Sequence, residues 1–190
     1  MWPWGHAAAG YLLYALWVRS RYRRAPAGPA TLALAVGTQF PDLVDKPLAW
    51  TLGVSPSGRA GAHSLLVAVP ILAVLWVGLS ERRRRRLWGG FAAGYLVHLA
   101  TDAVYPLVDG EFATLSFLLW PATSLSGLSE STGILAHFLA MELTSTLALE
   151  LLLFAVATAV WLADGGPGLA SLGRLVTRPF RTDPTTVSEK

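Results

Sequence analysis

Long apolar runs that carry very few charges constrain this chain more than any other feature of its sequence. Of its 190 residues, 53% are hydrophobic and only 14% are charged, whereas roughly 25% of the residues in a soluble domain are charged. Long runs with so few charges are typical of helices that cross a lipid bilayer. The sequence therefore predicts an all-α fold, a polytopic membrane helix bundle with the lipid bilayer as its main partner.

Five apolar segments make up the expected bundle. The second should stop at Pro41, because the residue before a proline disfavours the α region. The fifth exceeds the roughly 20 residues that a span requires, so it must tilt, kink or protrude. Residues 1–163 are expected to form one membrane-embedded domain, and residues 164–190 a loosely ordered cytoplasmic tail. The segments cover approximately residues 5–18, 30–40, 62–79, 87–108 and 132–163.

The basic residues predict the orientation of the bundle. All but two of the 15 Lys and Arg residues follow the first, third or fifth segment, and the exceptions are Lys46 and Arg59. The positive-inside rule then places the N-terminus outside and the C-terminus in the cytoplasm of a cell (inner) membrane. Because these clusters also explain the net charge of +3, no nucleic-acid partner is expected.

Seven ionisable residues share one end of the apolar segments. With the predicted orientation they all lie in the outer part of the bundle, although the orientation was derived without them. Ionisable side chains are costly inside a membrane, so such a group is a functional hypothesis. The residues are His6, His63, His98, His137, Asp42, Asp45 and Asp102.

Histidine and aspartate together indicate a divalent metal site. The chain has no cysteine, so a transition metal must use imidazole and carboxylate ligands, and zinc accepts both. A catalytic zinc lowers the pKa of its water and polarises the scissile group, which predicts metal-dependent hydrolysis at the outer face. The seven candidates are more than one zinc ion requires, so we expect either two ions, or one ion with the seven divided between ligands and the residues that orient them.

Two other functions use the same residues. A transporter with a proton or cation relay requires polar groups that continue to the cytoplasmic side. The inner halves of the first four segments are apolar, and Glu150 is the residue that keeps this alternative open. A scaffold whose polar cluster only holds helices together would carry no metal.

Five motifs, in their order along the chain, resemble the membrane-bound, metal-dependent hydrolases that are also described as LexA-binding, inner-membrane-associated hydrolases. The resemblance covers roughly residues 5–121 and implies a metal-dependent hydrolase. The order of His and Asp residues is also similar to zinc-dependent phospholipase C and related zinc nucleases, which implies a phosphoester substrate, either a small molecule or a lipid-linked one. The resemblance implies metal ligands at His6, His63, His98 and Asp102, and it makes His137 a ligand or the support of one. Asp42 and Asp45 are then expected as ligands or general base, and Arg59 as a partner of the substrate phosphate. The motifs are Gly5-His6, Pro41-Asp42 with Asp45, Ala62-His63-Ser64, Gly94-Tyr95 with His98 and Asp102, and Leu118-Leu119-Trp120-Pro121.

Overall fold

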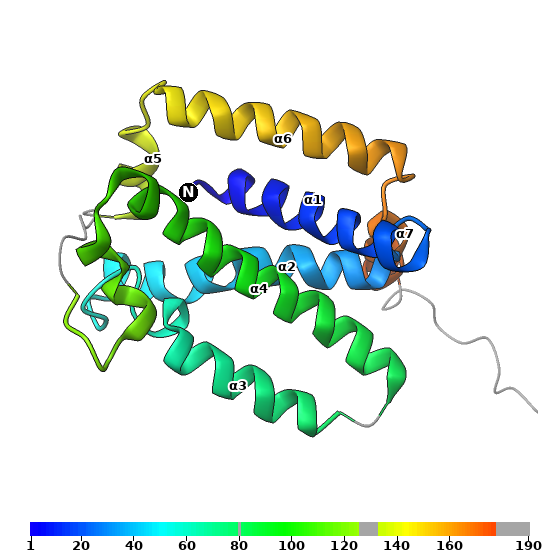
Figure 1. Ribbon diagram of the computed structural model, residues 1–190, viewed down its shortest axis with the longest axis horizontal. Coiled ribbons are helices and arrows are strands. Elements are labelled where there is room, and N and C mark those ends of the chain that lie inside the picture. Colours follow the sequence, from blue (N-terminus) through cyan, green and yellow to red (C-terminus); the bar gives the residue numbers. More distant parts are fainter. Residues whose placement is uncertain (80, 126–132, 178–190) are drawn as a thin grey trace, which may run out of the picture.

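The computed structural model describes residues 1–79, 81–125 and 133–177, and every regular element within these residues is a helix or helical turn. Five long helices, α1 to α4 and α6, form a bundle in which consecutive members run in alternating directions (Figure 1). The all-α fold class is therefore confirmed. The elements are α1 (Pro3–Tyr22), α2 (Gly28–Lys46), the π-helical turn η1 (Pro47–Thr51), the 3-10 turn η2 (Gly61–His63), α3 (Leu65–Val77), α4 (Arg82–Asp109), the 3-10 helix η3 (Phe112–Leu119), α5 (Ile134–Leu139), α6 (Ser145–Ala163) and α7 (Leu169–Thr177).

Two of the described helices are long and apolar enough to cross a membrane. They are residues Arg84–Asp109 of α4 and Ser145–Ala163, the whole of α6. Helix α3 is apolar but shorter. On α6 the side chains of Leu149, Leu152 and Leu162 are 62–65% exposed. Large apolar side chains that face outward along a whole helix are what a bundle presents to lipid.

Helices α2 and α4 pack so closely that glycine is required at their contact. A Cβ atom on Gly37 would lie 2.1 Å from the Phe91 carbonyl oxygen, and one on Gly94 would lie 2.2 Å from the Leu34 carbonyl oxygen. Small residues let helix backbones approach in this way inside membranes. Because His98 lies one turn beyond Gly94, this contact brings its ring against α2.

A small buried core joins α3 to a neighbouring face of α4. It consists of Ala68, Leu72, Tyr95 and Leu99. The Tyr95 hydroxyl donates a hydrogen bond of 2.6 Å to the carbonyl of Ala62 in η2. The core thereby fixes the turn that carries His63.

The two ends of the bundle differ in charge. Helix α5 and the loops after α2 and α4 gather at one end, on the left in Figure 1. The C-terminal end of α1 and the N-terminal end of α4 lie at the opposite end, together with α7. Arginines 19, 21, 23, 24 and 82–86 therefore all lie at the end opposite α5.

The sequence predicted that the second helix stops at Pro41, and this prediction is wrong. Helix α2 continues through Pro41 to Lys46. Pro41 removes one backbone hydrogen bond from the helix. Its side chain is almost fully buried, however, and packing in the bundle outweighs that loss. Asp42 and Asp45 consequently lie on a helix and not on the flexible segment that the sequence suggested.

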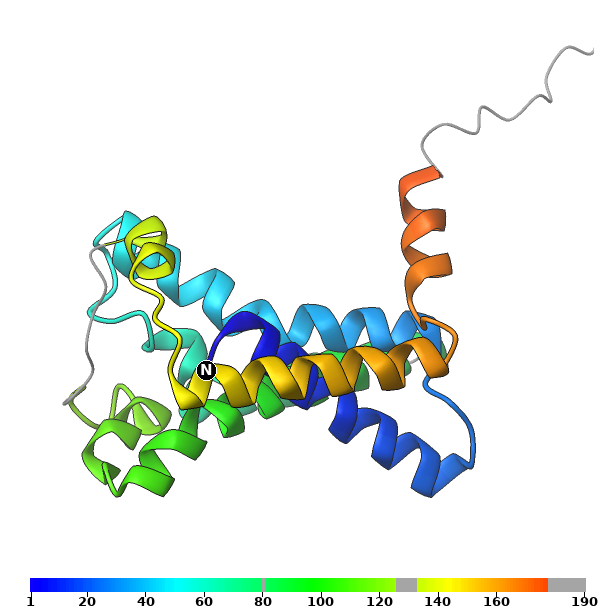
Figure 2. The same cartoon turned by 90° about the horizontal axis from the view of Figure 1, so that it is seen from above.

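The fifth apolar segment is broken, in agreement with the expectation that it must kink or protrude. Helix α5 ends at Leu139 and α6 begins at Ser145, with the Thr144 hydroxyl accepting a hydrogen bond of 3.1 Å from the Leu147 amide at the start of α6. Part of the expected loose tail is helical, because it contains α7. Gly165, Gly166 and Gly168 have positive φ angles and allow the turn between α6 and α7. Helix α7 points away from the axis of the bundle (Figure 2). Residues 178–190 of that tail lie outside the described part of the chain.

Candidate metal centre

Six of the seven predicted residues converge at the end of the bundle away from the arginine clusters. Helix α1 provides His6, α2 provides Asp42 and Asp45, η2 provides His63, and α4 provides His98 and Asp102. All six are between 0 and 8% exposed. The four elements are far apart in sequence, so the site exists only in the assembled bundle.

The ring nitrogens and carboxylate oxygens form two groups that could hold a metal ion. One group is His6, His98 and Asp102, and the other is Asp42, His63 and His98, with the ligand atoms of each group within 4.8 Å of one another. The Nε2 atoms of His63 and His98 lie 3.1 Å apart. Two nitrogens bound to one tetrahedral zinc at about 2.05 Å would be about 3.3 Å apart, so this spacing suits a shared ion.

His63 and His98 are anchored through their outer nitrogens. His63 Nδ1 lies 2.8 Å from Asp45 Oδ2, and His98 Nδ1 lies 2.7 Å from the carbonyl oxygen of Thr38. A carboxylate and a carbonyl only accept hydrogen bonds, so both Nδ1 atoms carry protons. Each Nε2 is therefore turned toward the centre, in the arrangement that orients histidine ligands around metals.

His6 is anchored in the same way by Thr101. The hydroxyl oxygen of Thr101 lies 2.9 Å from the backbone carbonyl oxygens of both Val97 and His98, so its single proton is donated to these carbonyls. Its lone pairs are left to accept from His6 Nδ1, 2.8 Å away. His6 Nε2 then faces Asp102 Oδ1 at 3.3 Å.

Two buried polar atoms of the centre have no hydrogen-bond partner among the described residues. They are His6 Nε2 and Asp42 Oδ1. A buried polar atom without a partner costs about 1–3 kcal/mol, and more when the group is charged. A bound cation would satisfy both atoms, so the residues present fit a divalent metal.

The centre also favours positive charge at His63. Burial disfavours the imidazolium, but the carboxylates of Asp42 and Asp45 outweigh burial and raise the pKa of the His63 side chain. Asp45 additionally accepts the backbone N–H groups of Ala62 and His63 at 3.0 Å. Asp45 thus holds both the ring and the backbone of His63 in place.

Three cationic groups contact the carboxylates of the centre. Lys46 Nζ lies 2.6 Å from Asp42 Oδ2, and Arg59 Nε lies 3.2 Å from Asp102 Oδ2. The N-terminal amine of Met1 lies 2.9 Å from Asp102 Oδ1. The negative charge of the two carboxylates is therefore balanced from the side of an adjoining cavity.

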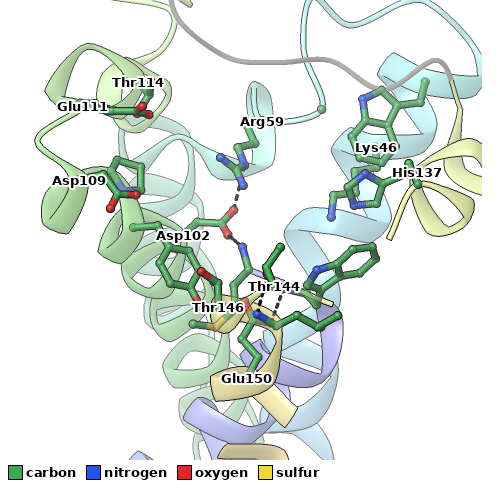
Figure 3. A pocket seen from close by; sticks show the side chains of 18 of the residues that line it. Lys46, Arg59, Asp102, Asp109, Glu111, Thr114, His137, Thr144, Thr146 and Glu150 are labelled. Carbon is green, nitrogen blue, oxygen red and sulfur yellow. Dashed lines mark hydrogen bonds and ion pairs between the residues drawn. The ribbon is translucent and has the colours of Figure 1, made fainter. Parts of the chain in front are cut away.

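That cavity has a volume of about 740 Å³, and Asp102 is its link to the metal centre. Asp109, Glu111 and Thr114 line one wall, and Lys46 and His137 line the wall opposite (Figure 3). Arg59 lies between these walls and points at Asp102. The cavity thus adjoins the centre at Asp102, the residue of the centre that lines it.

His137 is a predicted ligand that the structure places apart from the two groups, whereas Asp45, which also belongs to neither, contacts His63. It lies on α5, half-buried, where its ring packs 4.7 Å from the Trp2 ring and 5.0 Å from the Trp50 ring. Burial, together with the charge of Lys46, lowers the pKa of the His137 side chain. In this position His137 forms part of the cavity wall.

Glu150, for which the sequence offered no partner, is bound at the same end of the bundle. Its carboxylate accepts hydrogen bonds of 2.9 Å from the Tyr105 hydroxyl and the Trp2 amide. Thr38 and Thr101 are functional residues that sequence reasoning missed. Their only signals are positions one turn before Asp42 and three residues after His98.

Comparison with known proteins assigns the chain to an inner-membrane family. The family model of the YdjM inner membrane protein matches residues 1–166. No curated protein and no solved structure matches the chain significantly. The matched region contains every residue of the metal centre and both helices that are long and apolar enough to span a membrane. The chain therefore belongs to the YdjM inner membrane protein family.

Proposed function

We propose that this protein is a membrane-bound, zinc-dependent hydrolase that cleaves a phosphoester at the outer membrane face. The observation that carries the proposal is the convergence of three imidazole Nε2 atoms and two carboxylates, in which His6 Nε2 and Asp42 Oδ1 are buried and have no hydrogen-bond partner within the part of the chain that the structure describes. Zinc at such a centre supplies a Lewis acid and an activated water at neutral pH. Every other part of the reaction falls to the residues of the chain.

The ligand arrangement favours one ion. His98 offers only Nε2, because its Nδ1 is held by the Thr38 carbonyl. His98 belongs to both groups, and one lone pair serves one metal at a time. We assign His98 as the ligand common to both groups and draw the other two ligands from His6, His63 and Asp102, the remaining ligands that the sequence predicted, which leaves one position for water.

Asp42 and Asp45 have different roles in this proposal. Asp45 uses its oxygens on His63 and two backbone amides, so it is a positioning residue. Asp42 Oδ1 has no hydrogen-bond partner among residues 1–79, 81–125 and 133–177 and lies 3.4 Å from His63 Nε2. We assign Asp42 as the general base that accepts a proton from the attacking water.

Lys46 and Arg59 support an anionic substrate. Both border the 740 Å³ cavity, and each contacts a carboxylate of the centre. A guanidinium has five N–H donors, and only Nε is used on Asp102 here, so the group can also bind phosphoryl oxygens. A phosphoester bound between the two cations would have its phosphorus next to the metal centre.

The sidedness of the site supports a lipid or lipid-linked substrate. The site and the arginine clusters lie at opposite ends of the bundle, and the positive-inside rule puts the arginines in the cytoplasm. The cavity then opens toward the outer leaflet, where a headgroup can enter it. The five apolar helices would each cross the membrane, with α1 and α2 shielded by their neighbours.

The relay alternative receives less support. It needs polar groups that lead away from the centre, and Glu150, its strongest element, is held by Tyr105 and Trp2 beside the cavity. The hydrolase and relay proposals differ in a simple assay. A relay predicts uptake of protons or metal into sealed vesicles and no ester cleavage.

Hydrolysis is tested with purified protein, added zinc and two chromogenic substrates, p-nitrophenyl phosphate and bis(p-nitrophenyl) phosphate, together with a short-chain phospholipid. Asp42→Asn should lower the rate by a factor on the order of 10²–10⁴ while zinc remains bound. Asp109→Asn, in the same cavity but exposed and distant from the two ligand groups, should retain most of the activity. No cleavage of any of the three by zinc-loaded wild type, or equal rates in the two variants, would contradict the proposal.

A further inference from the structure

A second large cavity lies at the basic end of the bundle, away from the metal centre. It has a volume of about 840 Å³ and is enclosed by α1, α2 and α4, with Trp76 of α3 at its edge. Three arginines line it: Arg24 after α1, and Arg85 and Arg86 at the start of α4. We propose that this cavity binds one anionic phospholipid, with its phosphate on the arginines and an acyl chain along the apolar part.

The three arginines are available for a ligand. Within the described residues, none of them forms an ion pair with a carboxylate; the arginine ion pairs join Arg19 to Asp164, Arg59 to Asp102 and Arg84 to Glu81. Aromatic rings orient two of them: the Arg24 guanidinium lies 5.6 Å from the centre of the Tyr22 ring, and that of Arg85 lies 5.6 Å from the Trp76 ring. Arg85 Nε also donates a hydrogen bond of 2.6 Å to the Leu79 carbonyl, which uses one of the five donors of its guanidinium. Guanidinium groups without a carboxylate partner are suited to a phosphate.

The rest of the cavity is apolar and follows one face of α4. Arg86, Gly90, Ala93 and Val97 recur at helical spacing and all line it. Val97 lies about 16 Å along the helix axis from Arg86, at 1.5 Å per residue. A free phosphate would use only the arginine end, whereas a phospholipid uses both ends.

A missing side chain keeps the groove open. A Cβ atom on Gly89, which lines the cavity, would meet nothing within 4 Å. Trp17 and Trp76 line the cavity near the arginines, where the boundary between hydrocarbon and headgroups favours tryptophan. Basic pockets between membrane helices on the cytoplasmic side are suited to anionic headgroups. Since the cavity is separate from the metal centre, this proposal does not depend on hydrolysis.

The test compares two double variants that lose the same charge. Arg24→Gln with Arg86→Gln removes cavity arginines, whereas Arg23→Gln with Arg84→Gln removes exposed neighbours that do not line the cavity. Native mass spectrometry and thermal unfolding in neutral detergent would follow binding of phosphatidylglycerol, phosphatidylcholine and inorganic phosphate. We expect one phosphatidylglycerol bound by wild type and by the control, and binding about 10- to 30-fold weaker in the cavity variant.

Three results would overturn the proposal. The first is an equal loss of phosphatidylglycerol binding in the two double variants. The second is binding of phosphatidylcholine by wild type that is as strong as its binding of phosphatidylglycerol. The third is a thermal shift with inorganic phosphate as large as that with phosphatidylglycerol. Gly89→Phe provides a second route, because it fills the groove and keeps every arginine. It should also lose the bound lipid, and unchanged binding in Gly89→Phe would equally contradict the proposal.

Discussion

Each histidine of the metal centre has an acceptor behind it, and Asp45 is the one whose removal is most informative. It holds the Nδ1 proton of His63 and two backbone amides of the turn that carries this ring. Acceptors of this kind fix the ring orientation and raise the basicity of the ligand. The geometry of the candidate centre therefore depends on residues outside the two groups that could hold an ion.

Asp45→Asn should weaken zinc binding without abolishing it. Loss of a carboxylate behind a histidine ligand typically costs 10- to 100-fold in metal affinity, and a fall on that order is expected here. Competition with a fluorescent zinc chelator measures it. Asp109→Asn is the matched control and should bind as wild type does; an unchanged affinity in Asp45→Asn would remove the role assigned to Asp45.

Zinc affinity should rise with pH. The pKa of His63 is raised, so its imidazole holds its second proton to higher pH, and zinc must displace that proton. Affinity should thus increase as the pH rises through this pKa and level off above it. In Asp45→Asn one cause of the raised pKa is gone, so the increase should move to lower pH. Zinc affinity measured as a function of pH in wild type and in Asp45→Asn detects the shift. Superimposable curves would contradict the role of Asp45 in raising the pKa of His63.

At the scale of elements, the contact between α2 and α4 positions the centre. A Cβ atom on Gly90 would lie 2.4 Å from the Ala30 carbonyl oxygen, whereas one on Gly89 would meet nothing within 4 Å. The two adjacent glycines of α4 therefore differ in their structural role. Gly90, together with Gly94 and Gly37, allows α2 and α4 to approach closely, and Gly89 does not lie at this contact.

Gly90→Ala should destabilise the bundle and weaken zinc binding, while Gly89→Ala should do neither. Overpacking of a tight contact costs typically 1–3 kcal/mol, whereas alanine at an open helical position is favoured by up to about 1 kcal/mol. Thermal unfolding in detergent and zinc titration of both variants measure the difference. If the two variants behave alike, the close approach of α2 and α4 does not hold the site together.

The local spacings of the sequence were sufficient to predict part of the centre. His98 and Asp102 are four residues apart on one helix face, so their proximity follows from the helical repeat. The positions of the basic residues predicted the orientation of the segments, and that orientation placed His6 and His63 at the same end of the bundle. The continuation of α2 through Pro41 was not predictable, because burial of the ring decides it. Thr38 acts through its backbone carbonyl, which no side-chain pattern reveals. His137 was grouped with the ligands by its depth in the fifth segment and by the resemblance, which implies a further histidine from a late helix. Its contacts with Trp2 and Trp50 depend on where the fifth segment breaks.

For the whole molecule, the proposed orientation places the metal centre outside and the arginine clusters inside. The chain has no cysteine, so single cysteines can report sidedness without background. Glu111→Cys, exposed at the site end, should react with a membrane-impermeant maleimide in intact cells or spheroplasts. Arg21→Cys, exposed at the opposite end, should react only after permeabilisation. The reverse pattern would place the metal centre on the cytoplasmic side.

The most direct test of the central claim is the metal content of the purified protein. Elemental analysis should be done on wild type, on His98→Ala and on Asp109→Ala, each after loading with zinc and removal of free metal. We predict close to one zinc per chain in wild type and in Asp109→Ala, and almost none in His98→Ala, because His98 belongs to both ligand groups. Wild type without stoichiometric metal, or His98→Ala that retains it, would contradict the account.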